Sequence, residues 1–167
     1  RLHLEKYGVK ISYLPFIAKA MVAAMREYPD VNSTMDEERN LMLRKNYFNF
    51  GVAIATAQGL TVPVVRDVDQ KSIIEIAADI TELANRGRLG KLRPDDFGDG
   101  TCTITSLGKD AGIFATPILN HPEVGILGVN RIEERPVVRN GEVVVRHMTY
   151  FSGVFDHRVI DGHYGAG

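Results

Sequence analysis

Short apolar runs separated by turn residues are the feature that most limits how this chain can fold. Strand-like runs occupy residues 41–45, 50–57, 60–66, 101–107, 124–129, 136–139, 142–145 and 148–154. Only two segments carry apolar side chains at the three- and four-residue spacing of a helix. About seven or eight strands and two helices, without repeats or low-complexity tracts, predict one α+β domain, a mixed β-sheet with helices packed on one face.

The two predicted helices have clear starts and ends in the sequence. The first covers residues 11–28, and Pro29 ends it because proline cannot continue a helix. The second opens with the capping box at residues 72–75, in which a serine hydroxyl and a glutamate carboxylate satisfy each other's free amides. We predict that it runs to Asn85 and ends at Gly87.

Two turn signals predict β-hairpins. Gln58-Gly59 separates the runs 50–57 and 60–66, which are apolar at nearly every position and are therefore expected to be buried on both faces. Pro63 in the second run indicates a sheet edge or a bulge, because proline lacks the amide that a central strand needs. Asn140-Gly141 is the strongest hairpin signal in the chain.

Composition and charge exclude several classes of function. The 167 residues carry a net charge of −1, which predicts no nucleic-acid partner, and no apolar run approaches the length of a membrane span. The single cysteine, Cys102, allows no disulfide framework and indicates a reducing compartment. Because it lies in an apolar run with no histidine nearby, we interpret Cys102 as a core residue and not as a nucleophile.

Other charged or ligand-type residues carry weaker signals. No metal is predicted, because no spacing with carboxylates or cysteine indicates a site for the histidines at positions 3, 121, 147 and 163. A basic cluster follows the second predicted helix and consists of Arg86, Arg88, Lys91 and Arg93. We interpret this cluster as a solvated turn and not as a phosphate site.

One histidine stands where the last predicted strand ends. His157 follows the run 148–154, and Asp161-Gly162 comes four and five positions later. Asp-Gly is typical of a turn or a helix start, because aspartate caps free amides and glycine accepts a left-handed backbone. His157 is thus expected to be both rigidly held and reachable, although a packed histidine at a strand end fits this spacing equally well.

Residues 155–162 as a whole are more specific. Their sequence, FDHRVIDG, resembles the C-terminal signature of the acyltransferase (E2) core of 2-oxoacid dehydrogenase complexes, which shares its fold with chloramphenicol acetyltransferase. Further likeness lies in GVAIA at 51–55, GLTVPV at 59–64, TITSLG at 103–108 and PEVGILG at 122–128. The resemblance covers residues 9–162 and implies a chloramphenicol acetyltransferase-like fold. It also implies transfer of an acyl group between dihydrolipoamide and coenzyme A.

The resemblance also implies roles for particular residues. His157 matches the family's general base, which takes the proton from the attacking thiol. The family's oxyanion donor is a hydroxyl that falls on Thr105 when positions are matched, and Ser106 beside it remains an alternative. Asp161 matches a residue that supports the site. A serine triad is not indicated, because no serine lies in a Gly-x-Ser-x-Gly turn.

The same resemblance sets expectations for substrates, partners and domain content. Coenzyme A and dihydrolipoamide are the expected substrates, with the lipoyl group carried on a domain that this chain lacks. A homotrimer that assembles into a larger symmetric core is expected, with E1 and E3 components bound through segments that are also lacking. We therefore expect residues 1–167 to be a catalytic domain truncated at both ends. The expected location is the bacterial cytoplasm or, in a eukaryote, the mitochondrial matrix.

Two other functions remain open on the sequence. A chloramphenicol-type acetyltransferase would use the same fold and base, although the GLTVPV and PEV stretches argue against it. A structural core without activity is the other, and an intact His157 and a hydroxyl at Thr105 argue against that. A peptide-synthetase condensation domain is excluded, because Asp156 stands where that class has a second histidine. The acyl group itself stays open between acetyl, branched-chain and succinyl.

Overall fold

The computed structural model describes residues 11–106, 108 and 112–167. Its α-helices are α1 (Leu14–Glu27), α2 (Ile73–Arg88) and α3 (Gly162–Ala166), with short 3-10 turns at Pro29–Val31 and Pro94–Asp96. The strands are β1 (Ser33–Asp36), β2 (Leu41–Arg44), β3 (Phe50–Val52), β4 (Ile54–Thr56), β5 (Gly59–Thr61), β6 (Val64–Val65), β7 (Cys102–Ser106), β8 (Gly125–Val129), β9 (Glu133–Arg139), β10 (Glu142–Met148) and β11 (Phe151–Phe155).

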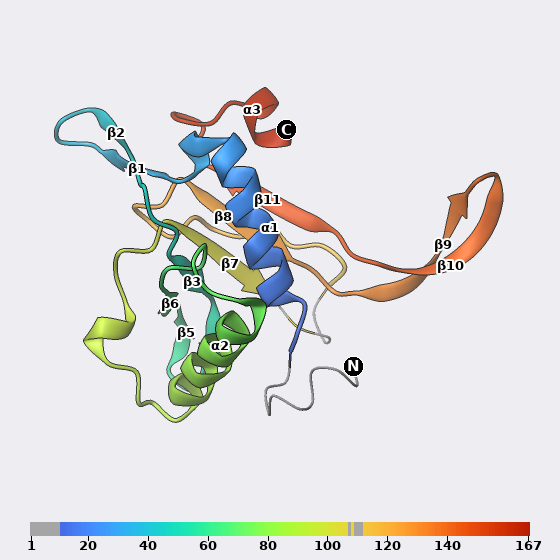
Figure 1. The fold of residues 1–167 in the computed structure, drawn as a ribbon, viewed down its shortest axis with the longest axis horizontal. Coiled ribbons are helices and arrows are strands. Elements are labelled where there is room, and N and C mark those ends of the chain that lie inside the picture. The colour runs from blue at the N-terminus through green and yellow to red at the C-terminus, as the bar shows by residue number, and fades with distance from the viewer. Residues whose placement is uncertain (1–10, 107, 109–111) are drawn as a thin grey trace.

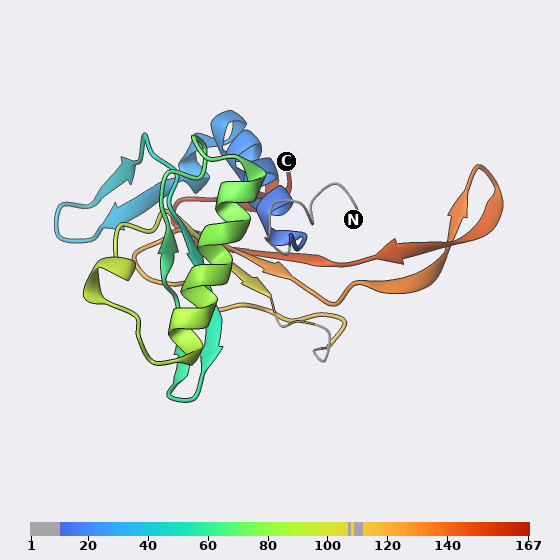
Figure 2. The same cartoon turned by 60° about the horizontal axis from the view of Figure 1, so that its bottom comes forward.

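A five-stranded mixed sheet forms the centre of the domain. Its strand order is β11-β8-β7-β3-β6, with β7 parallel to both β3 and β8, and with the edge strands β11 and β6 antiparallel to their neighbours. Helices α1 and α2 pack over this sheet (Figures 1 and 2). The predicted α+β class, with a mixed sheet and helices on one face, is confirmed.

Strand β7 shows how the sequence divides the sheet into two faces. Cys102 and Ile104 belong to the hydrophobic core that α1 and α2 cover, together with Val22 of α1 and Ile76 of α2. Because side chains alternate along a strand, Thr103 and Thr105 point to the opposite face. The helix-covered face is therefore filled with apolar groups, and the opposite face of β7 carries hydroxyls.

The sequence predicts that the long apolar runs at 50–57 and 60–66 are strands buried on both faces. The structure shows otherwise. Each run is split: β3 and β6 stay buried in the central sheet, whereas β4 and β5 form a separate hairpin ribbon. Leu60 in this ribbon is 72% exposed. The hairpin at Gln58-Gly59 is confirmed, and Pro63 lies beside the edge strand β6, as predicted for a residue without an amide.

Helix α2 does not end at Gly87. The capping box at its start is confirmed, but the helix runs one residue further, to Arg88. Gly87 is buried inside the helix, where an added Cβ would touch Ile54 and Leu92. The left-handed backbone that ends a helix is supplied instead by Gly90, with φ +65°. Gly87 is thus a buried residue within the helix and not the residue that ends it.

Two further differences concern the basic cluster and local pairing. Arg86 is not solvated with the rest of its cluster, because its guanidinium donates two hydrogen bonds to Asp96, at 2.7 and 2.8 Å. Strand β1 is absent from the predicted strand runs, because the largely polar sequence at 33–36 becomes a strand only by pairing with β2. The Asn140-Gly141 hairpin is confirmed, and β9 and β10 project from the sheet (Figure 2).

No described helix is long and apolar enough to span a membrane.

Candidate active site

His157 lies in a tight turn directly after β11. The amide of Asp156 donates to the carbonyl of Val124 at 2.9 Å, which fixes the end of the strand. The amides of Val159 and Ile160 then donate back to the carbonyl of Asp156, at 3.0 and 2.9 Å. Ile160 is buried beneath the turn, whereas His157 is exposed. The structure therefore places the imidazole on a rigid turn that solutes can reach, as expected.

Charged groups hold this turn from outside. The guanidinium of Arg158 donates to the Asp156 carboxylate at 2.6 to 3.1 Å and to Glu37, near the tip of the β1–β2 hairpin, at 2.9 Å. The hydrogen bonds that Arg158 donates lower the pKa of Asp156, and these bonds to Asp156 and to Glu37 raise the pKa of Arg158. We call Glu37, Asp156 and Arg158 the surface clamp.

Asp161 begins the short helix that follows the turn. Its carboxylate accepts a hydrogen bond from the amide of Tyr164 at 2.7 Å and so caps α3. His157 and Asp161 both line a shallow pocket of about 260 Å³ whose apolar wall includes Phe155 and Ile160. The structure thus brings the predicted base and the predicted supporting residue together, with the aspartate engaged by the backbone.

Thr105 and Ser106 end strand β7 and point to opposite faces of the sheet. Thr105 is half-buried on the face away from the helices, and Ser106 is exposed. Thr105 lines a pocket of about 520 Å³, the Thr105 pocket, together with Leu60, Val62, Thr103, residues 115–120 and residues 128–130. Of the two candidate donors, only Thr105 contributes to the lining of this pocket in the described part of the chain.

A buried carboxylate beside this pocket was not singled out as a functional residue in the sequence. Glu123 accepts a hydrogen bond from the Thr103 hydroxyl at 2.6 Å and another from the Asn120 amide at 3.0 Å. It is 5% exposed, and burial raises its pKa. The sequence signal for Glu123 is its place between Pro122 and the apolar run that forms β8. A carboxylate at the start of a buried strand is forced to be buried as well.

The two halves of the predicted site lie at opposite ends of the sheet within one chain. Thr105 is level with Gly128 of β8, which is level with Ser152 of β11. Strand β11 runs antiparallel to β7. From Ser152 it continues for three residues to Phe155, which is about 10 Å along the strand at 3.4 Å per residue. His157 lies beyond that point, so one chain does not bring its own His157 and Thr105 to a common centre.

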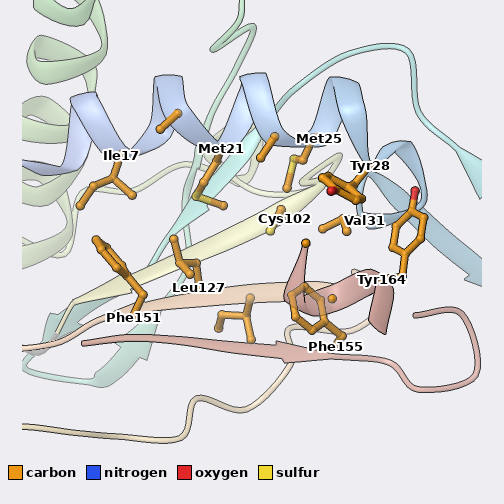
Figure 3. A pocket seen from close by; sticks show the side chains of 15 residues that line it. Ile17, Met21, Met25, Tyr28, Val31, Cys102, Leu127, Phe151, Phe155 and Tyr164 are labelled. Atoms are coloured by element: carbon orange, nitrogen blue, oxygen red, sulfur yellow. The ribbon is translucent and has the colours of Figure 1, made fainter. Parts of the chain in front are cut away.

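A third pocket lies between α1 and the sheet and is lined almost entirely by apolar side chains. It measures about 350 Å³, and Figure 3 shows Met21 and Met25 of α1 facing Leu127 and Phe155 across it. Cys102 lies at its floor, where burial raises the pKa of the thiol far above its usual range. The thiol is therefore a neutral packing group, in agreement with the interpretation of Cys102 as a core residue.

Known proteins resemble this chain over nearly its whole length. The sequence pattern of the family described as 2-oxoacid dehydrogenases acyltransferase (catalytic domain) matches residues 1–167. The dihydrolipoyllysine-residue acetyltransferase component of the pyruvate dehydrogenase complex of Bacillus subtilis is 44% identical over 155 residues, which cover 93% of this chain and 35% of that protein. The chain thus spans about a third of the length of this curated relative.

Solved structures show the same likeness. The dihydrolipoamide acetyltransferase of Azotobacter vinelandii, studied for the roles of a serine, a histidine and an asparagine in catalysis, matches with a TM-score of 0.94 and 42% identity, covering 99% of this chain and 68% of that one. The cubic core of a pyruvate dehydrogenase multienzyme complex matches with a TM-score of 0.94 and 41% identity, over the same shares of the two chains. Chloramphenicol acetyltransferase, at 13% identity and a TM-score of 0.52 over 93% of this chain and 73% of that one, shares the fold. The chain belongs to the catalytic-domain family of the 2-oxoacid dehydrogenase acyltransferases.

Proposed function

We propose that this chain is the catalytic core of an acyltransferase that moves an acyl group between dihydrolipoamide and coenzyme A in a 2-oxoacid dehydrogenase complex. One observation carries the assignment of residues. The serine, histidine and asparagine studied in the Azotobacter vinelandii enzyme have the same spacing along the chain as Thr105, His157 and Asp161 have here. This chain replaces the serine by threonine and the asparagine by aspartate, and both replacements keep an oxygen at the matching position.

The proposed reaction needs one base and one oxyanion donor. The imidazole of His157 takes the proton from the thiol of coenzyme A, and the resulting thiolate attacks the acyl carbon of acyl-dihydrolipoamide. The hydroxyl of Thr105 donates a hydrogen bond to the negative oxygen of the tetrahedral intermediate. When the intermediate collapses, the dihydrolipoamide thiolate leaves and takes the proton back from His157. One thioester thus replaces the other, and the thiol consumed on coenzyme A is balanced by the thiol released on dihydrolipoamide.

The opposite positions of His157 and Thr105 support an active site shared between subunits. Both groups must lie within hydrogen-bonding distance of one reacting thioester, yet the strand register separates them along the sheet. A second copy of the chain can supply the missing half, His157 from one subunit and Thr105 from its neighbour. We therefore propose a homotrimer that assembles further into a symmetric core, with E1 and E3 components bound through other parts of the whole protein.

The lining of the Thr105 pocket favours an uncharged acyl group. Within the described residues its polar groups are hydroxyls and amides, those of Thr103, Thr105, Thr116, Asn120 and Asn130. A succinyl group carries a carboxylate, which needs a cationic partner when it leaves water. Acetyl and branched-chain acyl groups have no such need, and the Bacillus subtilis relative is named as an acetyltransferase. Acetyl is thus the proposed substrate.

The test compares acyl donors on the assembled protein. Acetyl-, isobutyryl- and succinyl-CoA are each offered to dihydrolipoamide, and the initial rates are measured in the reverse direction. We expect acetyl-CoA to give the highest kcat/KM and succinyl-CoA the lowest. A preference for succinyl-CoA overturns the acyl assignment, transfer to chloramphenicol but not to dihydrolipoamide indicates a drug acetyltransferase, and assembly without any transfer indicates a structural core.

A further inference from the structure

The buried carboxylate of Glu123 has no role in the acyl transfer described above. Both of its oxygens accept hydrogen bonds from uncharged donors, the Thr103 hydroxyl at 2.6 Å and the Asn120 amide at 3.0 Å. A length of 2.6 Å is typical of a hydroxyl that donates to a carboxylate. Burying a charge without a cation is costly, so a residue of this kind is expected to do something that a neutral side chain would do less well.

The position of Glu123 joins the three walls of the Thr105 pocket. Thr103 belongs to β7 and points to the same face of the sheet as Thr105, two residues further on. Asn120 ends the segment 115–120, which forms a second wall. Glu123 itself stands just before β8, which supplies the third wall, including Gly128 level with Thr105. One carboxylate therefore ties together the elements that determine where the Thr105 hydroxyl lies.

Two glycines from other segments lie against this carboxylate and its hydroxyl partner. A Cβ added to Gly51 would lie 2.5 Å from the Thr103 hydroxyl oxygen, and one added to Gly100 would lie 2.5 Å from a Glu123 carboxylate oxygen. Both distances are shorter than real Cβ contacts, so a side chain at either position would displace Thr103 or Glu123 from the arrangement seen here. The absence of a side chain at Gly51 and Gly100 thus leaves room for the Thr103–Glu123 pair.

We propose that Glu123 is a positioning residue for the oxyanion donor, acting through Thr103 on β7 and through Asn120 on the facing wall. The proposal rests on the acyltransferase function proposed above. An oxyanion donor is effective when it lies about 2.7–3.1 Å from the oxygen that develops the negative charge, so small displacements matter. A shift of β7 at Thr103 is transmitted along the strand to Thr105. Loss of the hydrogen bonds to Glu123 therefore weakens the hydrogen bond from Thr105 to the oxyanion, although Glu123 does not touch substrate.

The first test is Glu123→Gln, which keeps the shape of the side chain. An amide nitrogen in place of one oxygen can no longer accept the Thr103 proton while the other oxygen keeps the Asn120 bond. We expect kcat to fall about tenfold with KM nearly unchanged, a smaller loss than direct removal of a donor because the displacement is partial. The variant should not unfold more easily, since a neutral amide costs less to bury than a carboxylate. Glu38→Gln, an identical change at an exposed position, is the matched control and should leave kcat unchanged.

Changes at Thr103 separate positioning from general packing. Thr103→Val keeps the volume and removes the hydroxyl, and it should lower kcat about as much as Glu123→Gln. The double variant should lose little more than either single one, because both remove the same interaction. Thr103→Ser keeps the hydroxyl and should restore most of the turnover.

The outcomes distinguish this proposal from the function on which it rests. An active unmodified protein whose Glu123→Gln form keeps its kcat, or loses kcat only in proportion to its folded fraction, overturns the positioning role. If the unmodified protein transfers no acyl group at all, the proposed function fails. Hydrogen exchange of the backbone amides from Thr103 to Ser106 then tests the positioning role of Glu123 without an activity assay. Faster exchange in Glu123→Gln supports this role, and unchanged exchange overturns it.

Discussion

The His157 turn and the Thr105 strand secure two halves of one proposed site by different physical means. The turn is exposed and is held by the surface clamp, in which Arg158 is 54% exposed. Thr105 lies on a central strand with neighbours on both sides, two residues from Thr103, which donates to a carboxylate that is almost completely buried. Surface ion pairs contribute little and weaken with salt, whereas buried polar networks are strong only when every member is satisfied.

Because of this difference, a substitution at His157 tests chemistry alone, whereas a substitution near Thr105 can also change stability. Removing the exposed imidazole should affect reactivity and leave the fold intact. Changes on the Thr105 side reach the interior, so each needs a variant of matched shape and a separate measurement of stability.

Replacing His157 by alanine should abolish acyl transfer while the domain stays folded. Loss of a general base typically costs about 100- to 10,000-fold in rate, and an exposed side chain contributes little packing. The rate is measured with acetyl-CoA and dihydrolipoamide, and folding is followed by thermal unfolding. His147→Ala, at an exposed histidine on β10, is the control. A folded His157→Ala protein with near-normal turnover removes His157 from the mechanism.

Replacing Thr105 by valine should lower kcat by about 100-fold or more, with little change in substrate binding, because the hydroxyl acts on charge that develops only in the transition state. Thr105→Ser keeps the hydroxyl and should keep most activity. Ser106→Ala, on the opposite face of β7, should have little effect. If Ser106→Ala is damaging and Thr105→Val is silent, the donor is Ser106 and the Thr105 pocket is not where the thioester binds.

Mixing the two inactive variants tests whether the two halves come from different subunits. His157→Ala and Thr105→Val chains are refolded together in equal amounts and assayed against each variant alone. If each site takes one group from each of two neighbours, random assembly gives about a quarter of the sites both intact groups, and a corresponding share of activity returns. If both groups come from one chain, every chain carries a defect and the mixture stays inactive.

The sequence allowed the His157 side to be predicted better than the Thr105 side. The strand end, the turn and the Asp161 cap are local features, and short-range spacing predicts them well. The β4–β5 ribbon was expected to be buried because its residues are apolar, but strand pairing decides which part of an apolar run enters the sheet. A glycine after an apolar helical stripe predicts a helix end at Gly87, but the left-handed residue that follows the helix is Gly90, three positions later.

The network at Glu123 depends most on tertiary structure. Thr103 and Glu123 are twenty residues apart, and nothing in either segment alone indicates a hydrogen bond. The sequence showed only an acidic residue beside an apolar strand. The distance between His157 and Thr105 likewise follows from the register of three strands, which local patterns do not specify.

The pH dependence of stability should differ in sign between the two regions. Burial raises the folded-state pKa of Glu123, so its protonated form favours folding, and stability falls as pH rises from the unfolded to the folded pKa. Arg158 lowers the folded-state pKa of Asp156, whose contribution is present above the unfolded pKa and is lost as pH falls through the folded one. At neutral pH, Glu123→Gln should raise the free energy of unfolding and Asp156→Asn should lower it, and both differences should vanish in acid. Chemical unfolding of the three proteins across the acid range measures this, and equal signs at neutral pH contradict it.

The smallest expected effect is at Glu37, where the surface clamp reaches the β1–β2 hairpin. The ion pair with Arg158 joins two exposed side chains, at 54% and 59% exposure, and pairs of this kind contribute little net free energy because water competes for both partners. Glu37→Gln should therefore lower kcat by no more than about twofold at low salt, and the difference should disappear near 1 M salt, where charges are screened within about 3 Å. Glu38→Gln is again the control. A loss of tenfold or more that is independent of salt would show that the hairpin positions His157 as firmly as Glu123 is proposed to position Thr105, and the contrast between the two regions would no longer hold.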